Sequence, residues 1–177
     1  MLNLPAPNPN SFQRLILRLA SARPVAWVLA RLLPSIDHIC LRLTGGRHTA
    51  TSLLSGLPVL ILTTRGARSG LPRQHLLLSV KDGERILLFP TNFGSEKAPA
   101  WLYNLRANPQ AELGYRGQQA EFLAHEASGE ELLRFWAMAD ALYPGYAAYR
   151  RRIHQRRVPV IVLEPVAAPE TSQQRSQ

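Results

Sequence analysis

The order of apolar and polar residues divides the chain into a helical first quarter and a strand-rich remainder. From residue 11 to residue 44 apolar residues recur every three or four positions, the repeat of an amphipathic helix. Phe12, Leu15 and Leu19 share one such face, and Ser11 before them is a suitable N-cap. The pattern predicts a first helix that begins at residue 11.

Two prolines and a glycine pair set the expected ends of the next helices. Pro24 suits the first turn of a second helix, which we expect to end near Pro34. Ser35 then suits the start of a third helix that stops at Gly45-Gly46. The first quarter is therefore expected to hold three short amphipathic helices.

From residue 57 onward the repeat changes to that of strands. The expected elements, in chain order, are strands over 59–64, 74–80 and 85–90, a loop over 91–97, a helix over 99–107, a hairpin of strands 111–115 and 118–125, a helix from Ser128 to about Leu142 and a last strand over 158–163. Asp82-Gly83 predicts a tight turn, and Ser128 with Glu131 predicts a capping box. Hairpins between most strands predict an α+β fold, a small barrel of about six mainly antiparallel strands with inserted helices and an N-terminal helical extension.

The same pattern predicts a division of the chain into three parts. Residues 1–47 form a basic amphipathic helical segment, and residues 48–166 form the barrel. Residues 167–177 are polar and poor in large apolar side chains, so we expect a disordered tail.

The charge of the chain favours an anionic ligand or surface. The formal net charge is +9, and only Lys81 and Lys97 among the 21 basic residues are lysines. Arginine binds phosphate and carboxylate groups through its planar fork of N–H donors. The motifs of nucleic-acid-binding domains are absent from the sequence, so we expect no nucleic acid as a partner.

Six arginines and one acidic residue, Asp37, lie within the first 47 positions. Three uses of these basic helices stay open: packing on the barrel, contact with another subunit in a homodimer, or docking on an anionic membrane surface. Arginines interrupt every long apolar run, so we expect no helix that spans a bilayer. The single cysteine, Cys40, is typical of a cytoplasmic protein, in this case one that can lie on the inner face of the cell membrane.

Two loops have the composition of anion-binding sites. Arg65, Arg68 and Arg73 surround Gly66 and Gly70 directly after the first expected strand, where glycines permit close approach of a ligand. The loop over 91–97 leads into a helix N-terminus, whose free backbone N–H groups favour a phosphate. Taken alone, the arginine loop is also consistent with a solvated turn, and the loop over 91–97 with an ordinary capped loop.

Three tyrosines, Tyr143, Tyr146 and Tyr149, recur every three residues around Pro144-Gly145. They can pack in the core, or they can face a flat ligand and donate a hydrogen bond or a proton. The five histidines lack the spacing of metal ligands, so no metal site is expected. Hydrolase elbows, Walker loops and dinucleotide fingerprints are absent as well.

Four ordered blocks give these features a common explanation. Residues 62–73 read LTTRGARSGLPR, residues 94–109 read GSEKAPAWLYNLRANP, residues 143–149 read YPGYAAY and residues 159–165 read PVIVLEP. In this order they resemble the deazaflavin-dependent nitroreductase family. The resemblance implies a split β-barrel that binds coenzyme F420 and transfers hydride from its reduced form to a quinone, an enone or a nitroaromatic acceptor.

The resemblance also implies roles for particular residues. The implied cofactor-binding residues are Arg65, Arg68, Ser69, Arg73, Thr91, Asn92, Phe93, Gly94, Lys97, Pro99 and Trp101. Tyr143, Tyr146 and Tyr149 are the implied acceptor-binding residues. Tyr146 is the expected proton donor, and the hydroxyl of Thr91 is expected to reach the cofactor ring or the acceptor.

Members of this family carry Ser-Lys-Gly where this chain has Thr91-Asn92-Phe93. The missing lysine leaves flavin mononucleotide (FMN) as an alternative cofactor and an FMN-dependent reductase as an alternative enzyme. A protein of another class is also compatible with the barrel, namely a non-catalytic carrier of a flavin, a tetrapyrrole or a lipid.

Overall fold

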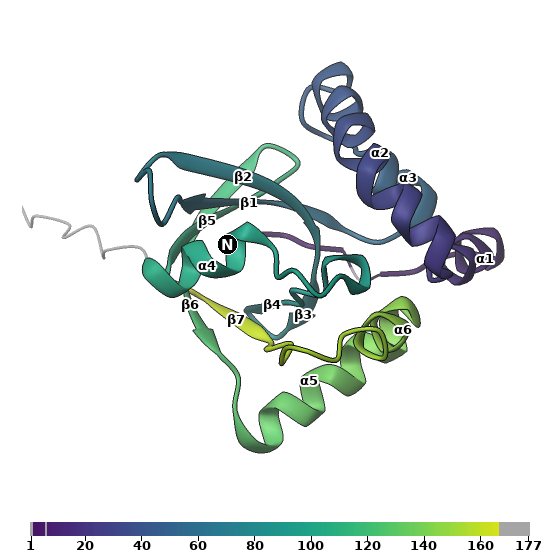
Figure 1. The fold of residues 1–177 in the computed structure, drawn as a ribbon. Helices are drawn as coiled ribbons and strands as arrows, with labels where there is room; N and C mark the ends of the chain where they lie inside the picture. Colours follow the sequence, from purple (N-terminus) through teal and green to yellow (C-terminus); the bar gives the residue numbers. More distant parts are fainter. Residues whose placement is uncertain (1, 6, 167–177) are drawn as a thin grey trace, which may run out of the picture.

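The structure, a computed structural model, describes residues 2–5 and 7–166 and shows a strongly curled sheet with helices around it (Figure 1). Its strands are β1 (Val59–Arg65), β2 (Pro72–Leu78), β3 (Val80–Asp82), β4 (Arg85–Leu88), β5 (Gln110–Tyr115), β6 (Gln118–Glu126) and β7 (Ile161–Pro165). They are hydrogen-bonded in the order β2-β1-β5-β6-β7-β4-β3, and every pair is antiparallel. The expected antiparallel α+β barrel is confirmed. The disordered tail expected over 167–177 lies outside the described residues.

A single bent stretch of chain supplies both edges of the sheet. The run expected to be one strand over 74–80 is divided at Ser79 into β2, which pairs with β1, and β3, which pairs with β4. The two edge strands are thus joined through one residue, which curls the sheet into a barrel. This break is why the structure has seven strands where the hydrophobic pattern predicted about six.

Alternation along the strands builds one core inside the barrel and another outside it. In β4, Ile86 and Leu88 point into the barrel core, whereas Leu87 belongs to the outer cluster. Helix α4 (Ala100–Ala107) closes the inner core with Trp101, Leu102 and Leu105, each at most 4% exposed. Helix α4 is therefore fixed to the barrel by its apolar face.

The outer cluster joins the back of β3, β4 and β7 to helices α5 (Gly129–Leu142) and α6 (Gly145–Arg150). Phe135 is its fully buried centre, and Trp136 packs its ring 5.0 Å from that of Phe89. The capping box expected at the start of α5 is wrong. Ser128 is the N-cap residue but makes no side-chain cap bond, and the Glu131 carboxylate pairs with Arg85 at 2.6 Å in place of the N-cap backbone.

The N-terminal helices are α1 (Ser11–Ala20), α2 (Arg23–Leu43) and α3 (Ala50–Ser55). The expected end of a helix near Pro34 is wrong, because α2 continues through this residue. Pro34 is exposed and cannot donate to the carbonyl of Ala30, yet its ring leaves the helix unbroken. Buried Asp37 holds the second half of α2 in place by accepting hydrogen bonds from the backbone N–H of Thr51 at 2.8 Å and from its hydroxyl at 2.5 Å.

Helix α3 was not expected from the pattern, and it links α2 to the barrel through β1. Leu2 and Leu4, which precede the helices, are 5% and 6% exposed and belong to the barrel core. The first residues therefore pack within the second of the three expected parts. The division of the chain at residue 47 stays a prediction.

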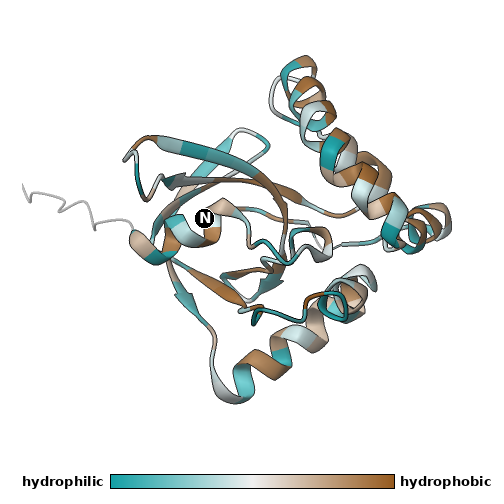
Figure 2. Cartoon of the chain, in the orientation of Figure 1, coloured by the Kyte–Doolittle hydropathy of each residue, from teal (hydrophilic) through white to brown (hydrophobic). Residues whose placement is uncertain are grey.

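Helices α1 and α2 leave apolar side chains in contact with solvent, and Figure 2 shows apolar residues recurring along both. On α2, Val28, Leu32, Ile36 and Ile39 are 43–58% exposed at spacings of three and four residues. Within the described residues α2 is also the one helix long and apolar enough to cross a membrane by length and composition. Only 11% of the residues in its most apolar stretch are buried. The expectation that its arginines rule out such a helix was therefore too strict.

Candidate functional site

The loop between β1 and β2 presents three arginines on one end of the barrel. Arg65, Arg68 and Arg73 are all exposed, and none takes part in the ion pairs found among the described residues. Gly66 lies in the tight part of the turn, where a Cβ would come 2.7 Å from the hydroxyl of Ser69. The loop is thus compact, while its guanidinium groups are free of carboxylate partners in this part of the chain.

A buried amide fixes this loop to helix α4. The side-chain oxygen of Asn104 accepts from the backbone N–H of Ala67 at 3.0 Å, and its amide group donates to the hydroxyl of Thr64 at 3.0 Å. Asn104 is 7% exposed, the bond to Thr64 is buried and the bond to Ala67 is partly buried, so leaving these bonds unmade is costly. Sequence reasoning missed Asn104, although it stands inside the second family block.

The second expected wall is a short 3-10 turn, η1 (Asn92–Gly94), between β4 and α4. Three successive residues have left-handed φ values, 46° at Asn92, 56° at Phe93 and 82° at Gly94. This conformation suits glycine and is tolerated by asparagine, but it strains a phenylalanine. A strained loop of this kind persists only where the surroundings fix it.

The three tyrosines come together next to this turn, inside the outer cluster. Tyr143, Tyr146 and Tyr149 are 4–5% exposed. The hydroxyls of Tyr143 and Tyr149 share a hydrogen bond of 2.8 Å, and Tyr149 also donates to the carbonyl of Ala20 at 3.3 Å. The ring of Tyr149 lies 6.2 Å from that of Phe93, so the tyrosine segment touches η1 directly.

Burial is the main reason that the pKa values of these three phenols are raised. It raises the pKa of Tyr146 well above its usual value, with a smaller contribution from nearby Tyr149. It raises the pKa of Tyr143 in the same direction. All three hydroxyls are therefore protonated across the physiological range, as hydrogen-bond donation requires. The small residue between them is needed as well, because a Cβ at Gly145 would come 2.1 Å from the Tyr143 ring.

Comparison with known proteins identifies the family to which this chain belongs. A profile of the F420H(2)-dependent quinone reductase family matches residues 32–165, which is most of the chain and includes both loops and the tyrosines. The chain belongs to this family. The F420H(2)-dependent quinone reductase of Mycobacterium tuberculosis strain H37Rv is 29% identical over 109 residues, which cover 60% of this chain and 72% of that protein. A second relative in this organism is 27% identical and is covered over 91% of its length.

Two solved structures share the fold of this family member. An F420-H2 dependent reductase is 31% identical with a TM-score of 0.56, and the match covers 60% of this chain and 94% of the other. A structure described as a domain-swapped dimer is 29% identical with a TM-score of 0.58, and covers 80% of this chain and 99% of the other.

The residues present fit an elongated anionic cofactor such as F420. The arginine loop packs beside Asn104 in the last turn of α4, whereas η1 precedes the first turn, so about 6 Å of helix, from Ala100 to Asn104, lies between the two walls. Unpaired guanidinium groups at one end suit phosphate and carboxylates. The backbone N–H groups at the start of α4 suit a second electronegative group.

The remaining predicted residues are placed as follows. Lys97 and Asn92 are exposed, Phe93, Gly94 and Pro99 are half-buried, and Thr91 is buried in the turn. Trp101 is 3% exposed and packs in the barrel core, so it supports α4 from within. The direct contacts of these residues with a cofactor stay predictions.

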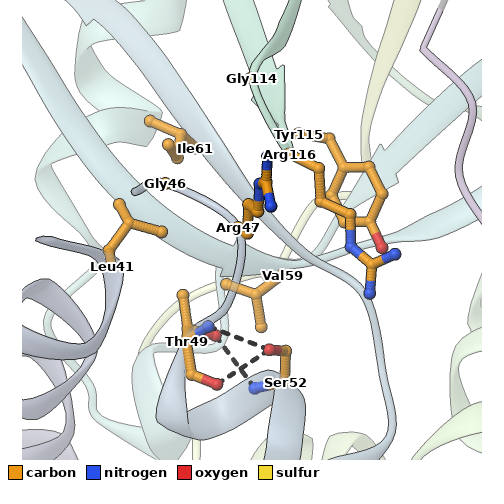
Figure 3. A pocket seen from close by; sticks show the side chains of 10 residues that line it. All are labelled: Leu41, Gly46, Arg47, Thr49, Ser52, Val59, Ile61, Gly114, Tyr115 and Arg116. Carbon is orange, nitrogen blue, oxygen red and sulfur yellow. Dashed lines mark hydrogen bonds between the residues drawn. The ribbon is translucent and has the colours of Figure 1, made fainter. Parts of the chain in front are cut away.

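A small pocket lies elsewhere, outside the barrel between the end of α2, the start of α3, and strands β1 and β5 (Figure 3). Arg47 and Arg116 stand at it, and none of the predicted site residues lines it. Thr49 and Ser52 also line it, but each hydroxyl accepts the other residue's backbone N–H as the cap of α3. This pocket is therefore separate from the two loops and the tyrosines.

Proposed function

We propose that this chain is an enzyme that reduces a quinone with reduced coenzyme F420. The observation that carries the proposal is the family match over residues 32–165. The arginine loop beside the last turn of α4, free of ion pairs within residues 2–5 and 7–166, and the η1 turn ahead of its first turn support it. Two similar proteins of Mycobacterium tuberculosis are named F420H(2)-dependent quinone reductases.

The role of the protein's own residues is to bind and orient the cofactor and to protonate the acceptor. The arginine loop holds the anionic tail of the cofactor, and Asn104 keeps that loop in register with α4. The η1 turn supports the ring end, and the tyrosines lie next to it through Phe93. When bound, reduced F420 supplies a hydride, and a phenol such as Tyr146 then supplies a proton to the acceptor oxygen.

The experiment compares the two cofactors that the sequence leaves open. Purified protein is titrated with F420 and with FMN, and the reduced form of each is then mixed with menadione. Tight F420 binding and turnover with menadione support the proposal. Preference for FMN supports the FMN-dependent reductase, and binding of either cofactor without turnover supports a carrier. A nitroaromatic acceptor, which we also propose as a substrate, is tested in the same assay.

We further propose that the protein is cytoplasmic and docks on the anionic inner face of the cell membrane through α1 and α2. The exposed apolar stripe of α2 lies close to Arg31, whose guanidinium lies 3.6 Å from the centre of the exposed Trp27 ring. A surface that combines apolar side chains, an aromatic ring and positive charge suits an interface with anionic lipid.

Vesicle sedimentation tests this docking with a matched control. Leu32→Glu places a charge on the stripe, whereas Leu133→Glu places one on α5 at a residue that is 71% exposed. We expect the parent and Leu133→Glu to sediment with anionic vesicles at low salt, and Leu32→Glu to stay in the supernatant. Equal sedimentation of both variants contradicts the docking surface.

Since one relative is a domain-swapped dimer, sedimentation velocity of the parent also distinguishes a monomer from a homodimer.

A further inference from the structure

The segment after α6 holds the strained η1 turn from outside. The Nη2 atom of Arg156 donates to the carbonyls of Pro90 at 3.0 Å, Thr91 at 3.4 Å and Ser95 at 3.0 Å. These carbonyls flank the left-handed residues on both sides. One guanidinium group thus joins the start of the turn to its end.

A side chain of the turn also binds the backbone of the segment after α6. The Glu96 carboxylate accepts from the backbone N–H of His154 at 2.7 Å and from that of Gln155 at 3.2 Å. These bonds, the first being the stronger cause, hold the pKa of Glu96 below its usual range, so the carboxylate is charged at neutral pH. Five hydrogen bonds, all donated by residues 154–156, therefore connect this segment with residues 90–96.

Arg156 is a poor choice for stability alone. Its Nε and Nη1 atoms are buried and have no hydrogen-bond partner within residues 2–5 and 7–166. Burial also lowers the pKa of the guanidinium, which reflects the cost of removing this cation from water. Arg156 is half-buried as a whole, and two buried N–H-bearing atoms of a cation that are left without partners require an explanation other than packing.

The turn that Arg156 holds is itself the second predicted cofactor wall, and it contacts the tyrosines. Gly94 is packed so closely that a Cβ there would come 3.3 Å from the Cα of Tyr149, and Phe93 contacts the ring of the same tyrosine. A shift of the turn would therefore move Thr91 and Lys97 relative to Tyr149.

We propose that Arg156 is a positioning residue, which holds the turn from Thr91 to Lys97 in its left-handed conformation so that the turn is preformed for the cofactor. This inference rests on the proposed function for the identity of the ligand, but not for the state of the free turn. The apparent dissociation constant rises as the inverse of the fraction of molecules with a competent turn. A turn that is competent in about 1–10% of molecules therefore weakens binding by about 10- to 100-fold.

The test replaces Arg156 with methionine, which keeps the length of the side chain and removes the three bonds to carbonyls. Arg157→Met is the matched control, because Arg157 is exposed and its loss changes the net charge equally. Arg156→Lys restores the charge with a single ammonium group in place of the fork. Affinity for F420 is measured by titration, and amide hydrogen exchange is measured on the free protein.

We expect Arg156→Met to bind F420 about 10- to 100-fold more weakly, Arg157→Met to bind within about 3-fold of the parent, and Arg156→Lys to lie between them. In the free protein, the amides of Gly94 and Ser95, which donate to Thr91 and Asn92 at 2.9 and 3.0 Å, should exchange faster in Arg156→Met. Core amides such as that of Leu62 should keep their protection, since a structural role alone would lower both together.

A folded Arg156→Met protein with parental affinity and parental exchange in the turn overturns the proposal. If Arg156→Met does not fold, Arg156→Lys decides it by the same two measurements, with parental values again overturning it. If the parent fails to bind F420, the proposed function fails, and hydrogen exchange of the free turn still supports or overturns the role of Arg156.

Discussion

Tyr146→Phe separates proton donation from packing more cleanly than any other change in the tyrosine cluster. The Tyr146 ring is 5% exposed and is held between Phe89, with centroids 4.9 Å apart, and Tyr143, with centroids 5.4 Å apart. Phenylalanine keeps these contacts and removes only the hydroxyl, for which no bond is found among the described residues. We therefore expect the free energy of unfolding to change by less than about 0.5 kcal/mol.

The expected effect on turnover is much larger. Burial keeps the Tyr146 hydroxyl protonated, so it is a donor at every pH at which the protein is assayed. Loss of a general acid typically slows the step it serves by about 100-fold, which corresponds to about 2.7 kcal/mol in the barrier. Affinity for the cofactor should remain within about 2-fold, because the tyrosine acts on the acceptor.

The assay is single-turnover oxidation of bound reduced cofactor by menadione, with Tyr143→Phe as the control. That variant also loses a buried hydroxyl, but one engaged with Tyr149 at 2.8 Å, so it should lose about 1 kcal/mol of stability and little rate. If Tyr146→Phe is as fast as the parent, Tyr146 has no part in proton transfer. In that case the cluster is purely structural, and Tyr146→Ala, at a cost of about 3–5 kcal/mol, reports only its packing.

Three further predictions concern other parts of the chain. Arg68→Ala should weaken F420 binding about 10- to 150-fold in a titration while leaving the melting temperature unchanged, and parental affinity would remove the arginine loop from the site. Asn104→Leu should lower the free energy of unfolding by about 2–4 kcal/mol in urea denaturation, because one buried and one partly buried hydrogen bond are lost; a loss below about 1 kcal/mol refutes this interpretation. Hydrogen bonds from Arg134, and then from Arg85, lower the pKa of Asp82. The stability that these bonds give to the folded protein is therefore present above the unfolded pKa of 3.8 and is lost as pH falls through the folded pKa. The difference in urea midpoint between parent and Asp82→Asn should accordingly be largest at about pH 7 and become smaller as pH falls below 3.8, and equal midpoints at every pH would show that these ion pairs contribute nothing.

Local patterns were enough to predict most of the barrel, because alternation and turn residues are encoded within a few positions. The strands from Val59 to Arg65 and from Gln118 to Glu126 agree with their predicted ranges to within about one or two residues. The break at Ser79 was not predictable in this way. It depends on which partner strand each half of the run meets, and that is set by the closure of the barrel.

Tertiary contacts also explain the other differences. The helix α2 continues through Pro34 because Asp37 is tied to α3, a partner that the helical repeat does not reveal. Among site residues, the arginines and the turn at Thr91 were identified by composition and by the family blocks. Asn104 and Arg156 were not, since each acts on backbone groups 37 to 66 positions away in sequence.

The proposed function is tested most directly by oxidation of reduced F420 by menadione on the purified protein, followed by the return of the absorbance of oxidised deazaflavin. We predict rapid oxidation that saturates with acceptor and is strongly reduced in Arg68→Ala at limiting cofactor. Oxidation no faster than in buffer, with protein that binds F420 and is folded, would contradict the assignment of this chain as a quinone reductase.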